Sequence, residues 1–357
     1  MTDRRIFLDI HAIQTVPPSN INRDDTGTPK IAQYGGVTRA RVSSQSWKKA
    51  MREYFAEQGG QEIGKRSKKI PQYIADKIRE KNSSIEEEKA LELAHKVLNA
   101  AGVSTDEKKN EVKALFFISP EQAEEMAKAA IEGLTDKKDK KELQTRLNNA
   151  PALDIVLFGR MVADDPTLNA DASAQVAHAI STHAVQTEFD FFTATDDISH
   201  EDSAGAGMLG TIEFNSSTLY RYANVAIHEL KKQMASHEDP KALAETLKLF
   251  VEAFVKSMPT GKSNTFANQT LPQALVVTLR GDRPVNLVSA FETPVKTSGG
   301  YLTESINKLK EEFKNEKFAD KPLLTLTVGA EGIGEELPDF NSLTAKFEEA
   351  LMNLLSK

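Results

Sequence analysis

The chain has 357 residues and a formal net charge of −7 at pH 7, so we expect a globular protein with one large domain or two modest ones. It contains no cysteine, which excludes disulfides, thiolate nucleophiles and cysteine-ligated zinc and fits a cytoplasmic protein. No run of about 18 apolar residues is present, so we predict no membrane span. The acidic total excludes a protein that is basic over its whole surface, but it is compatible with a local basic groove.

The first 42 residues predict two strands joined by a long loop. Residues 5–14 are β-rich and largely apolar, which is typical of a buried strand. Residues 16–30 are dense in Pro, Asn, Asp and Gly and predict a loop. Residues 37–42 alternate, so we expect a short strand or extended arm in which Arg39 and Arg41 point the same way.

Residues 42–54, with the sequence VSSQSWKKAMREY, predict one helix. Ser43 or Ser44 can cap its start, because a short hydroxyl side chain accepts a hydrogen bond from an unpaired N–H of the first turn. The glycine pair at 59–60 can end it. Apolar residues recur at helical spacing and predict one buried stripe, formed by Trp47, Ala50, Met51, Tyr54 and Phe55.

The opposite face of this helix is polar and positively charged, and consists of Gln45, Lys48, Lys49 and Arg52. Residues 26–52 as a whole contain no Asp or Glu. In an acidic protein, such a stretch favours an anionic ligand, although a solvated charged face explains the composition equally well. Cations in the first turns of a helix are opposed by its dipole, which tips the interpretation slightly towards a ligand.

Residues 60–150 change in character and predict a helical insertion into a sheet-based domain. We interpret the basic run KRSKK at 65–69 as a solvated loop. Residues 83–102 have a serine cap, an acidic first turn and a glycine stop. Residues 119–133 begin with Ser119, a proline and Gln122, which is the pattern of a capping box.

The next two segments predict a strand and a helix. Residues 152–162 are apolar and predict a second core strand that is broken at Gly159. Residues 172–185 predict a helix that carries His178 and His183. A separation of five residues places the two imidazoles about 140° apart around a helix, which disfavours a metal pair.

Residues 186–215 predict the tip of a long hairpin or a projecting arm. Large apolar residues lie there among acids, glycines and serines, namely Phe189, Phe191, Phe192, Met208 and Leu209. The remaining patterns predict strands at 217–230, 274–280 and 323–328 and helices at 240–258, 303–318 and 342–355. Helices and strands mix without strict alternation, which is typical of the α+β class.

No nucleotide-binding glycine motif, zinc-protease motif or serine-hydrolase elbow is present in the sequence. The acid pairs Asp24–Asp25 and Asp196–Asp197 could bind a metal or activate a nucleophile. Paired aspartates in loops more often cap turns, so we expect no enzyme activity, no metal and no cofactor.

Seven motifs, taken in chain order, resemble the CasC family. They are NRDD at 22–25, GG at 35–36, RVSSQSWKKAMR at 41–52, GRM at 159–161, AHAISTHAV at 177–185, DFFTATDD at 190–197 and LYRYANV at 219–225. CasC proteins are the backbone subunits of Cascade, the type I-E CRISPR surveillance complex, and belong to the RAMP superfamily. The similarity extends from the first strand to about Phe291, whereas residues 60–150 and the last 60 or so residues are less distinctive.

The resemblance implies a modified RRM-like, or ferredoxin-like, palm with a helical fingers insertion and a β-hairpin-like thumb. The palm would comprise residues 1–59, 150–185 and 216–357, the fingers 60–149 and the thumb 186–215. Several copies would form a homo-oligomeric filament along the crRNA guide. Each thumb would kink the RNA and flip one base, leaving short segments free to pair with a target DNA strand.

The resemblance also implies functional residues. Positions that match the family's contacts to the RNA backbone are Arg23, Lys30, Ser43, Gln45, Lys48, Lys49 and Arg52, and Arg39 and Arg41 add positive charge beside them. Met161 and Phe192 match wedge positions against the bases. Thr195 and Leu209 are looser matches on the thumb, and Thr195 departs from the more apolar residue expected there.

The expected partners are a crRNA guide, the target DNA strand, further copies of the chain and other Cascade subunits, with no membrane. The favoured function is a non-catalytic guide-RNA scaffold in antiviral defence. An alternative is a type III-like, metal-dependent endoribonuclease that uses Asp24 or Asp25. A third hypothesis is that the chain is a generic RRM-like RNA-binding protein, but this hypothesis does not explain the thumb.

Overall fold

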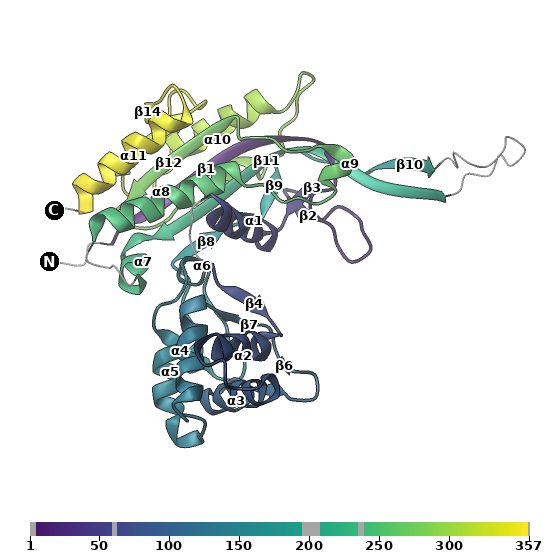
Figure 1. The fold of residues 1–357 in the computed structure, drawn as a ribbon. Helices are drawn as coiled ribbons and strands as arrows, with labels where there is room; N and C mark the ends of the chain where they lie inside the picture. The colour runs from purple at the N-terminus through teal and green to yellow at the C-terminus, as the bar shows by residue number, and fades with distance from the viewer. Residues whose placement is uncertain (1–4, 59–62, 195–207, 235–238, 356–357) are drawn as a thin grey trace, which may run out of the picture. The chain divides into compact units, whose positions relative to one another are not determined.

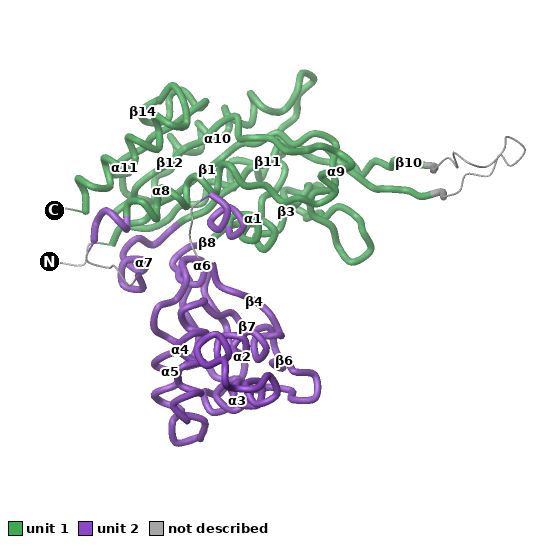
Figure 2. The backbone as a smooth tube through the Cα atoms, viewed as in Figure 1, with its two compact units in different colours: residues 1–51, 176–224, 244–357 green, residues 52–175, 225–243 purple. Residues whose placement is uncertain are grey.

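The chain forms two compact units, coloured separately in Figure 2. The computed structural model describes residues 5–58, 63–194, 208–234 and 239–355. Unit 1 comprises residues 1–51, 176–224 and 244–357. Unit 2 comprises residues 52–175 and 225–243, so it contains the predicted fingers insertion together with segments on either side of it.

Unit 1 is built on a large sheet, and its mixture with helices confirms the predicted α+β class (Figure 1). The strand order is β14 (Glu335–Glu336), β13 (Leu324–Val328), β12 (Ala274–Arg280), β1 (Phe7–Ser19), β11 (Met208–Ala226), β9 (Ala179–Ser181), β3 (Val37–Val42) and β2 (Ile31–Tyr34). β12 is antiparallel to both β1 and β13, and β9 is antiparallel to both β11 and β3. β13 and β14 are parallel.

One face of this sheet is covered by α10 (Leu302–Asn315) and the short helix η3 (Val288–Phe291). Buried side chains of β1, β11 and β12 pack there against Phe291 and Leu309. Burial of this apolar surface is the main force that holds the helix on the sheet.

The other face carries α8 (Pro240–Lys256) and α11 (Phe340–Leu355). Arg221 of β11 donates a hydrogen bond to a main-chain carbonyl of α8, whereas the residues on either side of it belong to the α10 side. An ion pair at 2.7 Å joins Lys248 of α8 to Glu348 of α11.

The prediction of a core strand at 152–162 was wrong, because the segment contains the helix α6 (Leu153–Phe158). Gly159, with φ of 80°, follows this helix and ends it. Ile155 packs with Phe117 in a small apolar cluster of unit 2. A short apolar run fits a buried helix as well as a buried strand, so its pattern alone could not decide.

The prediction of a helix at 172–185 was also wrong. The segment forms β8 (Ala174–Val176) and β9, with Ser181 paired to Leu219 and Ala179 paired to Val42. Pairing with two neighbouring strands outweighs the helix propensity of its alanines.

Other predictions for unit 1 are confirmed within a few residues, including α8, β12, α10, β13 and α11. β1 is longer than predicted and runs through two prolines to Ser19. The strand predicted at 217–230 is wrong over its last four residues, because β11 ends at Ala226 and α7 (Ile227–Gln233) begins there. α9 (Ser263–Phe266) is a single turn before β12.

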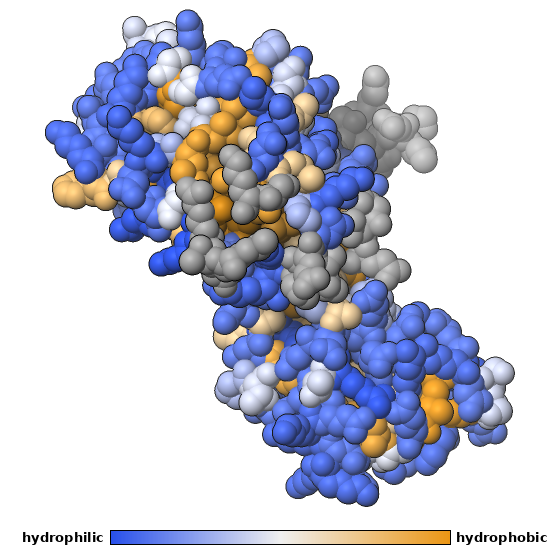
Figure 3. Space-filling model, turned by 90° about the vertical axis from the view of Figure 1, so that its left-hand side faces the viewer, coloured by the Kyte–Doolittle hydropathy of each residue, from blue (hydrophilic) through white to orange (hydrophobic). Residues whose placement is uncertain are grey.

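Unit 2 has its own apolar core, surrounded by α2 (Ile70–Lys81), α3 (Glu87–Ala101), α4 (Pro120–Ile131) and α5 (Lys140–Asn148). The four helices meet in one cluster that includes Ile74, Leu98, Met126 and Leu143. Their outer surfaces are mostly hydrophilic on the face seen in Figure 3. Two predicted helix signals are confirmed: Ser119 forms a capping box with Gln122, and Gly102 ends α3 at a φ of 100°. The serine cap predicted for α3 is wrong, because Glu86 is its N-cap and makes no side-chain cap hydrogen bond.

Two small sheets complete unit 2. β4 (Lys65–Ser67) pairs with β7 (Phe116–Ile118), and β5 (Thr105–Asp106) pairs with β6 (Glu111–Val112). The loop predicted for KRSKK is therefore wrong, since its first three residues are strand β4. Two short 3-10 helices also occur: η1 (Lys137–Asp139) directly precedes α5, and η2 (Pro166–Leu168) lies between α6 and β8. Across the described ranges, none of the helices combines the length and apolarity that a bilayer crossing needs.

Candidate nucleic-acid interface

Helix α1 (Ser44–Glu57) forms where the sequence predicts it. The Ser43 hydroxyl accepts a hydrogen bond from the N–H of Ser46 at 3.4 Å, which caps the first turn. The N–H of Ser43 in turn donates to the side-chain oxygen of Asn22 at 2.8 Å. The predicted stripe is confirmed, with Tyr54 half-buried and four residues buried, namely Trp47, Ala50, Met51 and Phe55.

The opposite face of α1 presents polar and positive groups. Gln45 and Lys49 are exposed, and Lys48 is half-buried. Burial lowers the pKa of Lys48 from its ordinary value. The first turn contains no acidic residue. This face therefore carries amide and ammonium groups, which are donors of the kind that bind anionic chains.

Two further cations lie next to the start of α1. The N–H of Arg41 donates to the carbonyl of Lys30 at 2.9 Å, which places both residues at one end of the β2–β3 hairpin. The Arg41 guanidinium lies 3.5 Å from Nδ1 of His178, and that nitrogen also accepts from the N–H of Ser44 at 3.3 Å. Burial, followed by the charges of Arg41 and Lys30, lowers the pKa of His178, so this imidazole stays a neutral acceptor.

A narrow pocket of about 20 Å³ opens at this point, which is room for one water-sized group. Its lining includes Lys30, Arg41, Asn22, Asn215 and Ser217. Asn215 is only 7% exposed, and its side-chain nitrogen has no hydrogen-bond partner in the described part of the chain. An anionic oxygen in this pocket would accept from that amide and lie close to two cations. The sequence analysis missed Asn215, which no local pattern singles out.

Arg39 does not have the role predicted for it. Its side chain is completely buried and donates to the carbonyl oxygens of Tyr34, Ser181 and Phe291 at 2.7–3.1 Å. A guanidinium used in this way ties the hairpin to neighbouring segments of unit 1 and is not available to a phosphate. Gly35, at a φ of 60°, comes so close to a carbonyl of the same region that a Cβ would clash with it.

Arg52 is likewise occupied by the protein itself. Its guanidinium pairs with the completely buried carboxylate of Asp154 at 2.7 Å and donates to the carbonyl of Gly64 at 2.9 Å. It also stacks 4.6 Å from the centre of the Phe117 ring. These contacts give Arg52 a structural role within unit 2, and its contact with RNA stays a prediction.

Met161 is 82% exposed, so its side chain is available for contact. The residue before it, Arg160, is buried and donates to the carbonyl of Leu168 and to the side chains of Gln122 and Asn148. Burial lowers the pKa of Arg160 to about 10, so it remains charged near neutral pH. These bonds fix the backbone that presents Met161.

The predicted hairpin is confirmed in the described residues. β10 (Glu188–Ala194) pairs antiparallel with the first part of β11, and Figure 1 shows both strands extending beyond the rest of the sheet. Phe192 lies opposite Gly210 and is half-buried, because its ring occupies the space where a Cβ of residue 210 would be. Phe189 and Phe191 point to the other face and are 67% and 66% exposed.

The two remaining thumb candidates are placed less fully. Leu209 pairs with Thr193 across the hairpin. Thr195 lies outside the described residues, as does the HEDSAGAG segment at 200–207.

The loop at 22–30 contains the acid pair that the alternative function needs. One carboxylate oxygen of Asp24 accepts from the N–H of Thr26, from its hydroxyl and from the N–H of Thr28, at 2.7–3.0 Å. These bonds lower the pKa of Asp24, and the residues beside it, Arg23 and Asp25, are exposed. Within the described ranges, no three His, Cys, Asp or Glu side chains group closely enough to hold a metal. Asp196 and Asp197 lie outside those ranges.

Solved structures similar to this chain come from RNA-guided complexes. A chain of a structure titled "CRISPR RNA-guided surveillance complex, pre-nicking" is 32% identical with a TM-score of 0.85, and the match covers 97% of this chain and 100% of that one. A chain of a "CRISPR RNA-guided surveillance complex" is 28% identical with a TM-score of 0.64, covering 96% and 99%. Curated protein sequences give no match. The model of the Cas family described as "CT1975-like protein" matches residues 8–350. Because that match spans nearly the whole chain, the protein belongs to the CT1975-like family of Cas proteins.

Proposed function

We propose that this chain is a non-catalytic, guide-RNA-binding backbone subunit of a type I-E CRISPR Cascade complex. Several copies form a filament along the spacer of the crRNA, and their thumbs kink the guide and present it to a target DNA strand in antiviral defence. Support comes from the similarity, along almost the whole chain, to subunits of RNA-guided surveillance complexes. Other Cascade subunits are the expected partners, in the cytoplasm, with an RRM-like palm as the RNA-binding core.

The pocket beside Asn215 is the observation that carries the proposal. A buried amide donor without a partner costs about 1–3 kcal/mol, so in native proteins a ligand or an ordered water usually completes it. Lys30 and Arg41 line the same pocket, and both favour a negative charge. A phosphodiester oxygen would satisfy the amide and neutralise the cations, which supports the RNA backbone as the proposed ligand.

The exposed face of α1 provides further contacts to the RNA backbone beside the pocket. Gln45, Lys48 and Lys49 follow the capped start of the helix and offer donors with no base-specific geometry. A subunit that serves any guide must hold phosphate and sugar and ignore sequence. The exposed Phe189 and Phe191 and the ring of Phe192 supply aromatic surface for stacking against bases of any sequence.

The alternative function, metal-dependent cleavage of RNA, depends on Asp24 or Asp25. The hydrogen bonds around Asp24 support a role in shaping the loop rather than in holding a metal. Incubation of the assembled complex with divalent metal and a complementary RNA tests this. We expect no cleavage, and cleavage that disappears in Asp25→Asn favours the nuclease.

The central experiment is a salt titration of guide binding. Replacing Lys30 and Arg41 with glutamine should weaken binding of all guides equally and reduce the slope of log K against log salt. Each lost phosphate contact to a single strand contributes about 0.7 to that slope. The matched control replaces the exposed Lys317 and Lys321 of unit 1, which removes the same charge elsewhere. Equal behaviour of the two variants excludes the pocket as an RNA contact.

A further inference from the structure

Unit 2 displays a cluster of exposed cations that the proposed function does not use. Four of them come from the KRSKK run and three from the segment after β5, namely Lys65, Arg66, Lys68, Lys69, Lys108, Lys109 and Lys113. The two segments are neighbours in space, because the N–H of Val112 donates to the carbonyl of Lys68 at 2.8 Å. We call this cluster the β4 basic surface.

The β4 basic surface differs from helices α2, α3 and α4 of unit 2 in how its charges are compensated. Lysines on the helices pair with carboxylates, as Lys77 does with Glu80 at 2.8 Å and Lys96 with Glu92 at 2.6 Å. None of the seven cations forms an ion pair with any residue that the structure describes. Pairing with surface carboxylates therefore does not explain why these cations gather on the β4 basic surface.

Nearby acids do not cancel the charge. The same region contains Asp106, Glu107 and Glu111, and the Asp164 carboxylate accepts from the N–H of Ser104 at 3.2 Å, so seven cations against four acids leave a net charge of +3. Asp106 also accepts hydrogen bonds from the main chain of Lys108 and Lys109 at 3.1 and 3.4 Å, so it shapes the turn. In a protein with a total charge of −7, such an excess is a local feature of charge distribution.

The backbone that carries these cations is fixed. Lys65 and Arg66 pair with Ile118 and Phe117 of β7, and both partners are buried. Gly64 donates to the buried carboxylate of Asp154 at 2.9 Å immediately before the strand begins. Side chains on an ordered strand lose less entropy on binding than the same residues in a loose loop.

The end of the basic run adds to the positive potential. Lys69 is the N-cap of α2, and the first turn of that helix contains no acid. The dipole of a helix makes its N-terminus positive, so cations there are opposed and a bound anion is favoured. An arrangement selected for stability alone would place acidic residues at this position.

We propose that the β4 basic surface is a second nucleic-acid site, which binds the phosphate backbone of a DNA duplex without reading its sequence. Cations spread along two neighbouring segments match the repeated charges of a polyanion better than one small anion. Binding of this kind releases counterions and falls steeply with salt. The site goes beyond the guide contacts proposed above, because it concerns a nucleic acid other than the bound guide.

The test compares two variants of the full chain assembled on its guide RNA. One replaces the four cations of the KRSKK run with glutamine, as K65Q/R66Q/K68Q/K69Q. The matched control, K77Q/K89Q/K96Q/K128Q, removes the same charge from ion-paired positions of unit 2. The probe is a short fluorescent DNA duplex with no complementarity to the guide, titrated at several salt concentrations.

We expect the first variant to bind this duplex about tenfold or more weakly and to reduce the slope of log K against log salt by roughly 2–4, since each B-DNA phosphate contributes about 0.9. The control should bind like the wild type, and both should retain the guide. Equal losses in the two variants, or no loss in either, overturn the proposal.

Loss of guide binding with duplex binding intact also overturns it, because the surface would then serve the guide. If the wild-type chain binds no guide at all, the proposed function fails. The free chain can still be titrated with the duplex, so the two proposals can fail separately.

Discussion

At the scale of single residues, buried arginines hold segments together in this protein. Arg39 donates to three main-chain carbonyls that lie far apart in sequence, whereas Arg41, two residues away, is half-buried and lines the pocket. We therefore expect the same residue type to serve structure at one position and to bind the guide at the other.

Replacement of these two arginines should separate the roles. Arg39→Gln leaves buried carbonyls without donors, so we expect the free energy of unfolding to fall by about 3–5 kcal/mol. Arg41→Gln should change it by less than about 1 kcal/mol but weaken guide binding. Urea unfolding and RNA titration of both variants check this. A stable Arg39→Gln protein that fails only in RNA binding would restore the role first predicted for Arg39.

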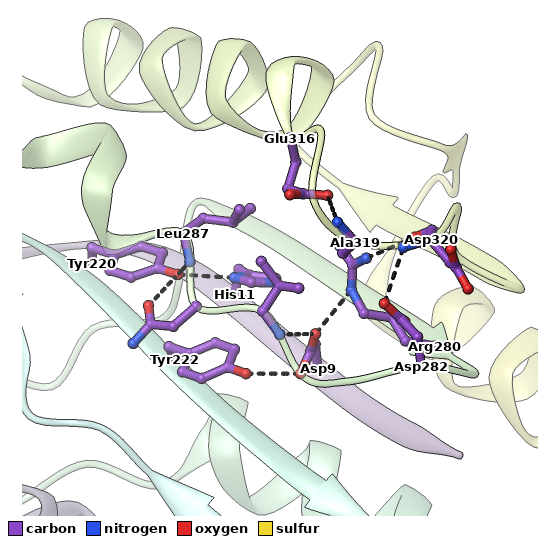
Figure 4. A network of polar contacts seen from close by, with 12 residues as sticks. Asp9, His11, Tyr220, Tyr222, Arg280, Asp282, Leu287, Glu316, Ala319 and Asp320 are labelled. Carbon is purple, nitrogen blue, oxygen red and sulfur yellow. Dashed lines mark hydrogen bonds and ion pairs between the residues drawn. The ribbon is translucent and has the colours of Figure 1, made fainter. Parts of the chain in front are cut away.

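A buried polar network links β1, β11 and β12 at the residue scale (Figure 4). Asp9 pairs with Arg280 at 3.1 Å and accepts from the Tyr222 hydroxyl at 2.8 Å, while Nδ1 of His11 lies 2.9 Å from the Tyr220 hydroxyl. Desolvation raises the pKa of Asp9 to about 6, against the lowering effect of its hydrogen bonds and of Arg280. Desolvation lowers the pKa of His11 to about 3.

The pKa shifts of Asp9 and His11 should have opposite effects on the pH dependence of stability between about pH 4 and pH 6. The unfolded chain then carries a proton on His11 and none on Asp9, and the folded chain carries one on Asp9 and none on His11. The proton numbers are equal, so this pair makes stability nearly independent of pH in that range.

Single substitutions should reveal how each of the two groups changes the free energy of unfolding with pH. In Asp9→Asn only His11 remains, so acidification destabilises the fold by about 1.4 kcal/mol per pH unit. In His11→Gln only Asp9 remains, so acidification stabilises the fold by a similar amount. Urea midpoints at several pH values measure both slopes. Slopes of the same sign would show that the pair does not titrate in this way.

At the scale of elements, α1 combines a buried stripe with a polar face that begins at a capped end. The double variant Lys48→Ala/Lys49→Ala should weaken the binding of all guides alike. It should also reduce the slope of log K against log salt by up to about 1.4, since each phosphate contact contributes about 0.7. Stability should change little, since neither side chain is buried in the core. RNA titration at several salt concentrations provides the measurement, and an unchanged slope would remove this face from the interface.

The hairpin of β10 and β11 allows a second prediction at this scale. Phe192→Ala should leave the core of unit 1 folded, because the hairpin extends beyond the sheet, yet it should weaken assembly on the guide. Chemical probing of the RNA should lose its periodic pattern of reactive, flipped bases.

Phe191→Ala is the matched comparison on the exposed face of the hairpin. If the periodic pattern survives Phe192→Ala and disappears in Phe191→Ala, the wedge lies on the exposed face and Phe192 only packs against Gly210.

At the scale of the whole molecule, the proposed filament predicts how size depends on RNA. The chain alone should remain small in solution and should assemble stoichiometrically when guide RNA is added. Light scattering coupled to size exclusion measures this directly. A chain that binds RNA one-to-one at every guide length would fit a generic RNA binder instead.

Local signals were enough to predict many elements of this protein from sequence. The Ser119 capping box, the stop at Gly102 and the stripe of α1 act within one or two helical turns, so the residues that decide them are close in sequence. The order of motifs, and with it the CRISPR relationship, was also readable without a structure. The same holds for the hairpin or arm predicted at 186–215, where β10 pairs with the first part of β11.

Long-range contacts decided the rest. Residues 179–181 became a strand because β3 and β11 lie on either side, and no local pattern reports those partners. Arg39 and Arg52 carry the same charge as Lys49, but Arg39 is buried among carbonyls and Arg52 pairs with the buried Asp154, so both hold the fold together. Composition thus determined how much positive charge residues 26–52 contain. Tertiary structure decided which of those charges are tied into the fold and which stay at the surface, because burial and pairing depend on residues far away in the chain.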